Sequence, residues 1–583
     1  MSTEAIPPQK ETGDLMLEQG KLTEKQLEQA RRSQLRLGIP QHRAVVDLNY
    51  ASEEDTYRAL AKLHHLDFIE HDKIILSPAV LEIVPLKLIF HHQMVPISID
   101  GEVLTLVFGE PPRQMELGNL RLLLSKRLKV VLTTPSSIHA ILKKQFGLGA
   151  QTIQRLREER GVKNDVSEDI IFDVKSTGEN SAVDATISDF VDQVLLEALR
   201  LQATDIHIEP YHSSIRLRYR IDGLMQTVPV PDFMRQLHET IASRLKIMAG
   251  LNIAEKRLPH DGRISMKTGN EEYDLRVSVI PTKHGETVCL RILGRQSLFL
   301  DLGQLGMEPQ HEALFAELTQ LPQGLILLTG PTGSGKTTTL YAALAHANDE
   351  SRKIITIEDP IEYQLEGISQ IQVRQDIGLT FTSGLRSVLR HDPDIVLIGE
   401  IRDAETAEIA VRTAQTGHLV FSTLHTNDSL SAITRLMDMK IDPFLIGSSL
   451  VCSIAQRLAR RICRHCMEED DSIPENFRNE MAKSLGIGAV EVKAWKGRGC
   501  IECNQRGYRG RVAIYEFFLL NDEIADMIEP GLKTGHLRKI MRKHGWRSLR
   551  ELAWGKVQSG LIPIAEVQRL THRIHFEIEN LES

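Results

Sequence analysis

The chain has 583 residues, of which 42% are hydrophobic and 25% are charged, and its formal net charge is −8. This composition is typical of soluble globular proteins, and the length predicts several domains. The acidic balance argues against a protein whose main partner is nucleic acid. Six cysteines in so long a chain do not make a disulfide framework.

No apolar run approaches the roughly 20 residues that a membrane-spanning helix needs. The first 20 residues are polar and lack the apolar core of a signal peptide. We therefore expect a cytoplasmic protein, and any association with a membrane would pass through a partner.

Residues 1–64 predict a helical N-terminal domain with a weak internal repeat, because segment 17–27 is echoed by segment 46–56. Thr23 with Gln26 predicts a capping box, and Ser52 with Asp55 a similar helix start. The pattern favours a docking domain, and a small-ligand site in the two turns is the alternative.

Residues 65–148 predict a second N-terminal αβ subdomain, in which Asp100-Gly101 is a hairpin turn between strands 94–99 and 103–108. No residue of this segment carries obvious chemistry. Residues 149–181 are polar and charged, and we expect a mobile linker there.

Residues 182–295 predict a further αβ domain. Arg216, Arg218 and Arg220 alternate with apolar residues, which places three guanidinium groups on one face of a strand. This face either contacts phosphate or is a solvated surface paired with Asp205 or Glu209.

Residues 330–337 fit G-x-x-x-x-G-K-[ST], the phosphate-binding P-loop. An apolar strand over 324–329 and a helix over 338–345 give this loop the required context, which argues against a merely structural Gly-rich turn. Lys336 would reach the β- and γ-phosphates of ATP, and the hydroxyl of Thr337 would bind Mg²⁺.

Acidic residues follow the next two predicted strands. Glu358, Asp359 and Glu362 stand at the end of an apolar run, and Glu400 follows another. In parallel α/β sheets ligands bind at the carboxyl ends of strands, so these side chains should converge on the P-loop. Glu400 is our first candidate for the group that orients or deprotonates the attacking water, and Glu362 is the second.

A third strand, 419–423, leads to His425, with His418 at its beginning. A histidine at a strand tip would sense the γ-phosphate or stabilise the site, and a purely structural role is the alternative. Together these patterns predict an α/β multidomain protein with an ATPase core over residues 296–460.

Two C-x-x-C pairs, Cys463 with Cys466 and Cys500 with Cys503, predict a zinc subdomain over residues 461–510. Reduced buried thiols and a redox pair are the alternatives. We expect residues 511–583 to form a C-terminal helical region.

Four segments, 330–337, 358–362, 395–400 and 418–425, resemble the Walker A, Asp, Walker B and His boxes of the secretion ATPases. These are the hexameric motors of type II secretion and type IV pilus assembly. Segments 203–210 and 257–263 extend the likeness to roughly residues 182–570.

The resemblance implies a RecA-like core preceded by a PAS-like αβ domain, in a homo-hexamer that hydrolyses ATP with Mg²⁺ to assemble pilin-like subunits. It implies inner-membrane platform and cytoplasmic adaptor partners. A scaffold that binds ATP with little turnover is the alternative. A nucleic-acid motor is a third reading, and the net charge of −8 and the lack of basic-aromatic patches argue against it.

The resemblance also assigns residues. Arg220, Arg276 and Arg291 match the arginines donated toward the nucleotide, and His418 and His425 match the His box. Gly399 stands where Walker B usually has aspartate, so Thr337, phosphates and water would hold magnesium. The residues matching nucleotide contacts are Gly330, Pro331, Thr332, Gly333, Ser334, Gly335, Lys336, Thr337, Thr338, Glu358, Asp359 and Arg457.

The four cysteines resemble the zinc element of assembly motors, as opposed to retraction motors. The N-terminal repeat resembles a domain that in some members binds cyclic di-GMP through an Arg-Leu-Gly start before each repeat. Here Glu11-Thr12-Gly13 stands at the first start and Arg36-Leu37-Gly38 precedes the second. With one matching start of two, we expect docking on an adaptor and no cyclic di-GMP binding.

Overall fold

The computed structural model describes residues 11–76, 80, 83–147, 182–231, 234–268, 271–294 and 301–571. Two compact units make up the chain: Met1–Ile264 with Leu275–Ile292, and Ser265–Asp274 with Leu293–Ser583. The expected linker, 149–181, lies outside the described residues.

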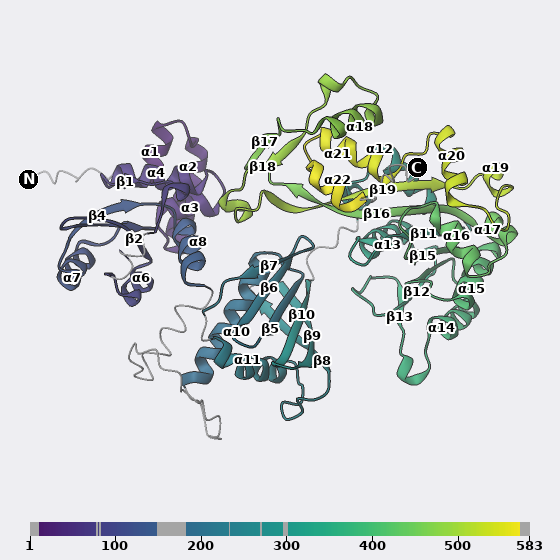
Figure 1. Ribbon diagram of the computed structural model, residues 1–583, viewed down its shortest axis with the longest axis horizontal. Helices are drawn as coiled ribbons and strands as arrows, with labels where there is room; N and C mark the ends of the chain where they lie inside the picture. Colours follow the sequence, from purple (N-terminus) through teal and green to yellow (C-terminus); the bar gives the residue numbers. More distant parts are fainter. Residues whose placement is uncertain are drawn as a thin grey trace, which may run out of the picture. The chain divides into compact units, whose positions relative to one another are not determined.

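The first unit begins with four helices, drawn in purple in Figure 1, and both expected helix starts are present. Thr23 accepts a hydrogen bond from the Gln26 backbone N–H, and Ser52 accepts one from that of Asp55. Met16, Ala30 and Val45 lie in the small core between the helices. The helices are α1 (Thr12–Glu18), α2 (Glu24–Leu37), α3 (Gln41–Asp47) and α4 (Glu53–Leu63).

A four-stranded sheet follows, in the order β1-β4-β3-β2. The expected hairpin is present, since Asp100 pairs with Val103 and Gly101 adopts a left-handed φ of 56°. The elements are β1 (Asp67–Phe68), α6 (Leu86–His92), β2 (Met94–Asp100), β3 (Val103–Phe108), α7 (Gln114–Leu124), β4 (Arg127–Leu132) and α8 (Pro135–Phe146).

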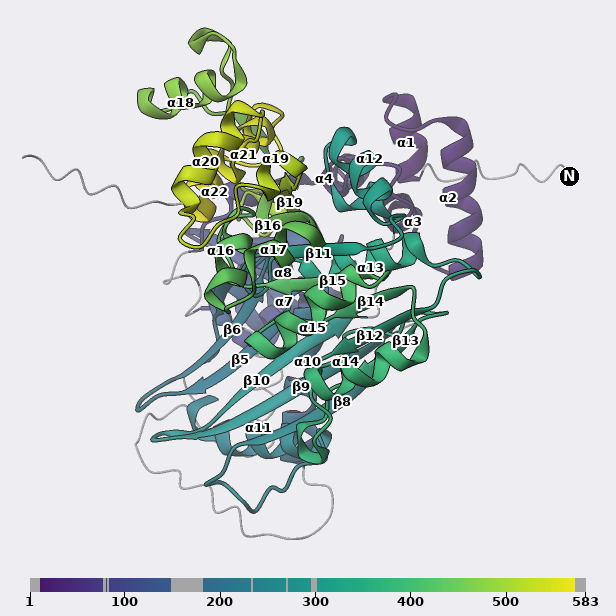
Figure 2. The ribbon, with the colours of Figure 1, turned by 90° about the vertical axis from the view of Figure 1, so that its right-hand side faces the viewer.

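A six-stranded sheet follows, in the order β7-β6-β5-β10-β9-β8, and Figure 2 shows β6, β5, β10, β9 and β8 side by side. Most of this sheet belongs to the first unit, and the end of β8 and the start of β9 belong to the second. Tyr219 is fully buried and donates a hydrogen bond from its hydroxyl to the Val194 carbonyl oxygen, which ties β6 to α10. The elements are α10 (Ala182–Arg200), β5 (Asp205–Pro210), β6 (Ile215–Ile221), β7 (Leu224–Val228), α11 (Met234–Met248), β8 (His260–Thr268), β9 (Glu271–Thr282) and β10 (Gly285–Gly294).

The second unit is built on a seven-stranded sheet, in the order β13-β12-β14-β15-β11-β16-β19. All neighbours pair in parallel except β16 and β19, so the carboxyl ends of the other six strands, from β13 to β16 in the sheet order, lie at one edge of the sheet. The strands are β11 (Gly324–Thr329), β12 (Ile354–Glu358), β13 (Ser369–Gln372), β14 (Ile395–Ile398), β15 (Leu419–Leu424), β16 (Leu450–Ile462) and β19 (Tyr508–Leu519).

Helices cover both faces of this sheet, because its central strands are apolar on both sides. Figure 1 shows α13 and α15 on opposite sides of β11 and β15. Leu327 and Val420 pack on the α15 side, and Ile326 and Phe421 on the α13 side. The helices are α12 (Pro309–Leu318), α13 (Lys336–Ala347), α14 (Phe381–Val388), α15 (Ala404–Gln415), α16 (Ser431–Asp438) and α17 (Pro443–Ser449).

The segment between β16 and β19 contains the cysteines, the two-stranded sheet of β17 (Met467–Glu469) and β18 (Trp495–Gly497), and α18 (Glu475–Leu485). The boundary expected at residue 511 is wrong, because β19 is a strand of the ATPase sheet. The helices begin after it: α19 (Asp522–Ala525), α20 (Thr534–Lys543), α21 (Leu549–Gln558) and α22 (Ile564–Thr571). Residues 572–583 lie outside the described part of the chain.

Within the described residues, no helix combines the length and the hydropathy that a membrane crossing requires.

Candidate active site

The P-loop lies between β11 and α13, and Lys336 begins the helix. Its ammonium donates hydrogen bonds to the carbonyl oxygens of Gly330, at 2.7 Å, and Pro331, at 3.2 Å. Burial lowers the pKa of Lys336 to about 8; the nearby Glu400 carboxylate opposes this shift and Arg457 adds to it. Pro331, Thr332, Gly333 and Thr337 are exposed, and Thr338 is half-buried.

Strand β16 packs directly against this loop and explains two of its glycines. Gly330 has a φ of 148°, and a Cβ there would lie 2.6 Å from the Gln456 carbonyl oxygen. Gly335 has a φ of 90°, and its Cβ would lie 2.9 Å from Nε2 of Gln456. Only glycine fits these positions.

The hydroxyl of Ser334 is buried and has no hydrogen-bond partner among the described residues. Buried polar atoms normally have a partner, and a phosphate oxygen would supply one here. The loop therefore fits a nucleotide phosphate by its shape and by an unused donor.

Glu400 lies beyond the end of β14, next to His425 from the end of β15. Nε2 of His425 is 3.3 Å from Oε2 of Glu400, and Arg402 forms an ion pair with the other carboxylate oxygen. The end of β15 is tied to the residue after β14, because the Thr423 hydroxyl donates a hydrogen bond to the Gly399 carbonyl oxygen at 2.8 Å. The structure thus brings Lys336, Glu400 and His425 to one edge of the sheet, where a phosphoryl transfer site is expected.

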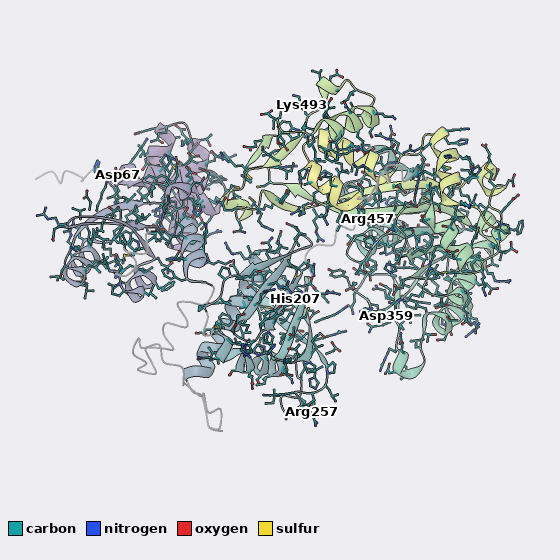
Figure 3. All side chains as sticks on the ribbon, in the orientation of Figure 1. Asp67, His207, Arg257, Asp359, Arg457 and Lys493 are labelled. Atoms are coloured by element: carbon teal, nitrogen blue, oxygen red, sulfur yellow. The ribbon has the colours of Figure 1, made fainter. Side chains whose placement is uncertain are left out.

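The remaining acidic residues lie around Glu400 or beneath it. Asp359, labelled in Figure 3, is exposed and follows the end of β12. Its charge raises the pKa of Arg402, after the larger effects of Glu400. Glu362 lies half-buried in the same loop, farther from the strand. Because Glu400 contacts His425, it stays the first candidate for the catalytic base.

Glu358 is 4% exposed and is enclosed by protein donors. Its carboxylate accepts hydrogen bonds from Tyr341, from the Thr356 hydroxyl at 2.6 Å and from Gln370 at 3.1 Å. These contacts join the P-loop helix to β12 and β13. They give Glu358 a structural role in one chain, so the contact with nucleotide expected for it is not supported by its position.

Close packing explains why position 399, after strand β14, is a glycine and not the aspartate that Walker B usually has. A Cβ at this position would lie 3.2 Å from the Ile357 carbonyl oxygen and 3.4 Å from the Glu358 Cα. The backbone of β12 therefore leaves little room for a carboxylate side chain there.

His418 lies at the opposite edge of the sheet from His425. It precedes β15, its carbonyl oxygen accepts a hydrogen bond from the Gly324 N–H at the start of β11, and its Nδ1 is 3.1 Å from the Thr413 carbonyl oxygen. Strand β15 has six residues, so the two histidines are roughly 20 Å apart. A catalytic role of His418 at the site of its own chain is therefore not supported.

The predicted arginines lie in the sheet of the first unit, and two of them share one partner. Nε of Arg220 is 3.3 Å and Nε of Arg291 is 3.1 Å from the carboxylate of Asp205. Arg218 pairs with Glu209. Arg276 lies half-buried on β9. Within this unit, the arginines of β6 therefore have the carboxylate partners, Asp205 and Glu209, that were expected for a solvated surface. Their donation toward a nucleotide stays a prediction.

The four cysteines lie together, with all four Sγ atoms within 4.8 Å of one another. Sγ of Cys463 is 3.8 Å from that of Cys500, and Cys466 and Cys503 are equally far apart. Thiolates around a tetrahedral zinc, with Zn–S bonds of about 2.3 Å, would be about 3.8 Å apart. The Gly507 and Gly499 N–H groups point at the sulfurs of Cys503 and Cys466, at 3.2 and 3.3 Å. This arrangement fits zinc.

Known protein families match both the ATPase core and the N-terminal part of the chain. The family model described as "Type II/IV secretion system protein" matches residues 180–569, which is more than half of the chain. The chain belongs to this family. A second model, described as "MshEN domain", matches residues 64–152.

Several known proteins are similar to this chain. The type IV pilus assembly ATPase PilB of Myxococcus xanthus is 37% identical to it over 559 residues, which are 95% of this chain and 98% of that protein. The type II secretion system protein HxcR of Pseudomonas aeruginosa is 47% identical over 387 residues, 66% of this chain and 78% of that protein. The X-ray structure of the Legionella pneumophila ATPase DotB covers 66% of this chain and 95% of its own, with a TM-score of 0.50 at 21% identity, which shows the fold alone.

These matches confirm an ATPase of type II secretion or type IV pilus assembly with an α/β multidomain fold. Sequence reasoning missed Arg402 and Gln456. Arg402 had a weak signal, because it lies two residues after Glu400, whereas Gln456 had none, because it meets the P-loop only through sheet pairing.

Proposed function

We propose that this secretion ATPase works as a homo-hexamer that hydrolyses ATP to assemble pilin-like subunits, in type II secretion or type IV pilus extension. The observation that carries the proposal is the meeting of Lys336, Glu400 and His425 beside a P-loop that fits phosphate. Full-length similarity to a pilus assembly ATPase and higher identity over two thirds of the chain to a type II secretion protein support both machines.

In the proposed reaction, the P-loop N–H groups and Lys336 bind the β- and γ-phosphates. Glu400 orients or deprotonates the attacking water, while His425 and Arg402 hold its carboxylate in place. Mg²⁺ fits the exposed hydroxyl of Thr337, and when bound it neutralises charge on the transferred phosphoryl group. Arg457, 9% exposed on β16 (Figure 3), lies near enough to Lys336 to lower its pKa, and this supports nucleotide contact.

The test compares ATP turnover of the purified, zinc-replete chain with that of Lys336→Ala, with and without the platform partner. Lys493→Ala, a change of an exposed lysine in the same unit, is the matched control. We expect Lys336→Ala to lose at least about 100-fold in turnover, because phosphate binding and charge neutralisation are both removed. Equal turnover of wild type and Lys336→Ala in the presence of the partner would contradict the proposal and favour the scaffold alternative.

Two structural assignments belong with this proposal. The four cysteines bind Zn²⁺, supported by their sulfur spacing and by the N–H groups directed at the sulfurs. The αβ domain of the first unit is PAS-like, supported by a sheet in which the first strand, β5, lies beside the last, β10.

We further propose that the N-terminal domain docks on a cytoplasmic adaptor of the inner-membrane platform. The motor would then be cytoplasmic and peripheral to the membrane through its partners, and it would bind no nucleic acid.

The proposal also excludes cyclic di-GMP as a ligand of the N-terminal domain. The first repeat begins with two carboxylates, Glu11 and Asp14, which pair with Gln34 and Arg31. Carboxylates at this start would repel the phosphates of a dinucleotide. Equilibrium dialysis that showed specific binding of cyclic di-GMP would contradict this part.

A further inference from the structure

The loop that brings His425 to Glu400 is short and connects β15 to α16. The side chain of His425 is 50% exposed, so packing around its ring does not fix its position. The contact with Glu400 therefore depends on the backbone of residues 425–430.

Three consecutive residues of this loop are held from outside it. The Asn427 carbonyl oxygen accepts a hydrogen bond from Nη2 of Arg457 at 2.9 Å. Oδ2 of Asp428 accepts one from Nη2 of Arg538 at 2.6 Å. Ser429 donates its backbone N–H and its hydroxyl to Oε1 of Glu516, at 2.7 and 2.6 Å.

Glu516 connects the loop to the C-terminal helices. It lies on β19, is 1% exposed, and its Oε2 accepts a hydrogen bond from the backbone N–H of Leu549, the first residue of α21, at 2.7 Å. A buried carboxylate is costly unless donors surround it, and here three donors and the positive end of a helix do so. Removing the charge would release both the loop and the start of α21.

Asp428 makes a second connection, to α20. Its Oδ1 accepts a hydrogen bond from the Ser431 N–H at 2.8 Å and so fixes the start of α16, while Oδ2 pairs with Arg538. The side chains of Arg538 and Asp428 are 23% and 18% exposed. Because water is largely excluded, this pair holds the loop more firmly than a surface ion pair would.

We propose that Glu516 and Arg538 are positioning residues through which α20 and α21 hold the His425 loop in the geometry that meets Glu400. The inference rests on the proposed ATPase function. Neither residue belongs to the P-loop, so their loss should slow turnover and leave nucleotide binding intact.

The experiment uses full-length Arg538→Ala, Arg538→Lys and Glu516→Gln. The matched control is Arg542→Ala, on the same helix, whose ion pair with Glu551 is more exposed. We expect turnover at saturating ATP to fall about 10-fold in Arg538→Ala and Glu516→Gln, since misplacement by a fraction of an ångström has effects of this order. The dissociation constant of a non-hydrolysable ATP analogue should stay within about twofold, because the phosphate loop is untouched. Arg538→Lys should recover more than half of the turnover, because a point charge still pairs with Asp428.

Unchanged turnover in both variants, or a weaker binding of the analogue that accounts for the loss, would overturn the proposal. A second measurement does not need hydrolysis. Amide hydrogen exchange at Ser429 and Leu549 should be faster in Glu516→Gln than in wild type, and unchanged in Arg542→Ala. Wild type that hydrolyses no ATP would contradict the proposed function, whereas unchanged exchange at these two amides would contradict the positioning role alone.

Discussion

Lys336 and Glu400 lie within each other's electrostatic influence, yet their charges have different surroundings. Lys336 is bound to carbonyl oxygens of its own loop, and Glu400 is paired with Arg402 and His425. Each group therefore has a protein partner that a nucleotide or a water molecule would have to replace. At the residue scale, the proposed hydrolysis would require this exchange of partners.

The first prediction concerns the catalytic base. Glu400→Gln should lower turnover by about 100- to 1000-fold while ATP still binds, because an amide cannot accept a proton from water. Glu362→Gln should have a smaller effect. The measurement is steady-state hydrolysis with parallel binding of a fluorescent ATP analogue. A larger loss in Glu362→Gln than in Glu400→Gln would exchange the roles of the two residues.

The second prediction concerns the protonation of Lys336, whose pKa burial lowers to about 8. Phosphate favours the charged ammonium, so binding ATP at pH 8.5 should take up a proton, and affinity should fall as the pH rises above 8. Folding stability should change with pH in the opposite direction to ATP affinity. Burial of the charged ammonium costs stability below pH 8, and this cost declines as the pH rises toward 10.5, the ordinary pKa of lysine.

Isothermal titration calorimetry in two buffers of different ionisation enthalpy would measure this proton uptake. Lys336→Ala supplies the control, and equal uptake by that variant would assign the proton to another group.

At the scale of elements, β16 connects two sites. Gln456 and Arg457 contact the P-loop region, and the same strand ends immediately before Cys463. Its partner β19 leaves the cysteine segment and contains Glu516. The pair of strands therefore joins the nucleotide site to the four cysteines and to the C-terminal helices through continuous backbone.

The third prediction tests the metal. The purified chain should contain one zinc ion, and Cys500→Ser should lower this content to below about one tenth, because three thiolates hold zinc much less tightly than four. Elemental analysis by mass spectrometry measures the content. Removing zinc with a chelator should lower the melting temperature, whereas Cys452→Ala, a buried cysteine outside the cluster, should keep its zinc.

At the scale of the whole molecule, the first unit contains Arg220, Arg276 and Arg291, the arginines expected to reach a nucleotide, and the second unit contains the phosphate site. In one chain Arg220 and Arg291 are paired with Asp205. If they act on nucleotide in the proposed hexamer, their effect should appear only when chains assemble.

The fourth prediction follows from this division. Turnover per chain should rise with protein concentration and level off once the chains are assembled. Arg291→Ala should lower this maximal turnover at least about 10-fold without changing the assembled mass, because an arginine that contacts the transferred phosphoryl group has a large effect on its transfer. Light scattering coupled to chromatography measures the mass. Arg257→Ala, an exposed arginine paired within its own loop, is the control. Turnover independent of concentration in monomeric fractions would contradict the proposal.

The sequence by itself determined the phosphate loop, the acidic strand ends and the cysteine pairs, because each depends on residues a few positions apart. The spacing of Gly330, Gly335 and Lys336 encodes a turn and a helix start, and a strand of known direction places Glu400 at the sheet edge where the loop lies. Local backbone geometry is sufficient for such features.

Only the tertiary structure decided which side chains at those strand ends face the site. Glu358 is buried by Tyr341 and Gln370, and His418 lies a strand length from His425, although both matched the family's boxes. Strand β19 and the contacts of Glu516 and Arg538 join segments 87 and 110 residues apart. Burial and pairing at such separations depend on how the sheet is assembled, and no local pattern encodes them.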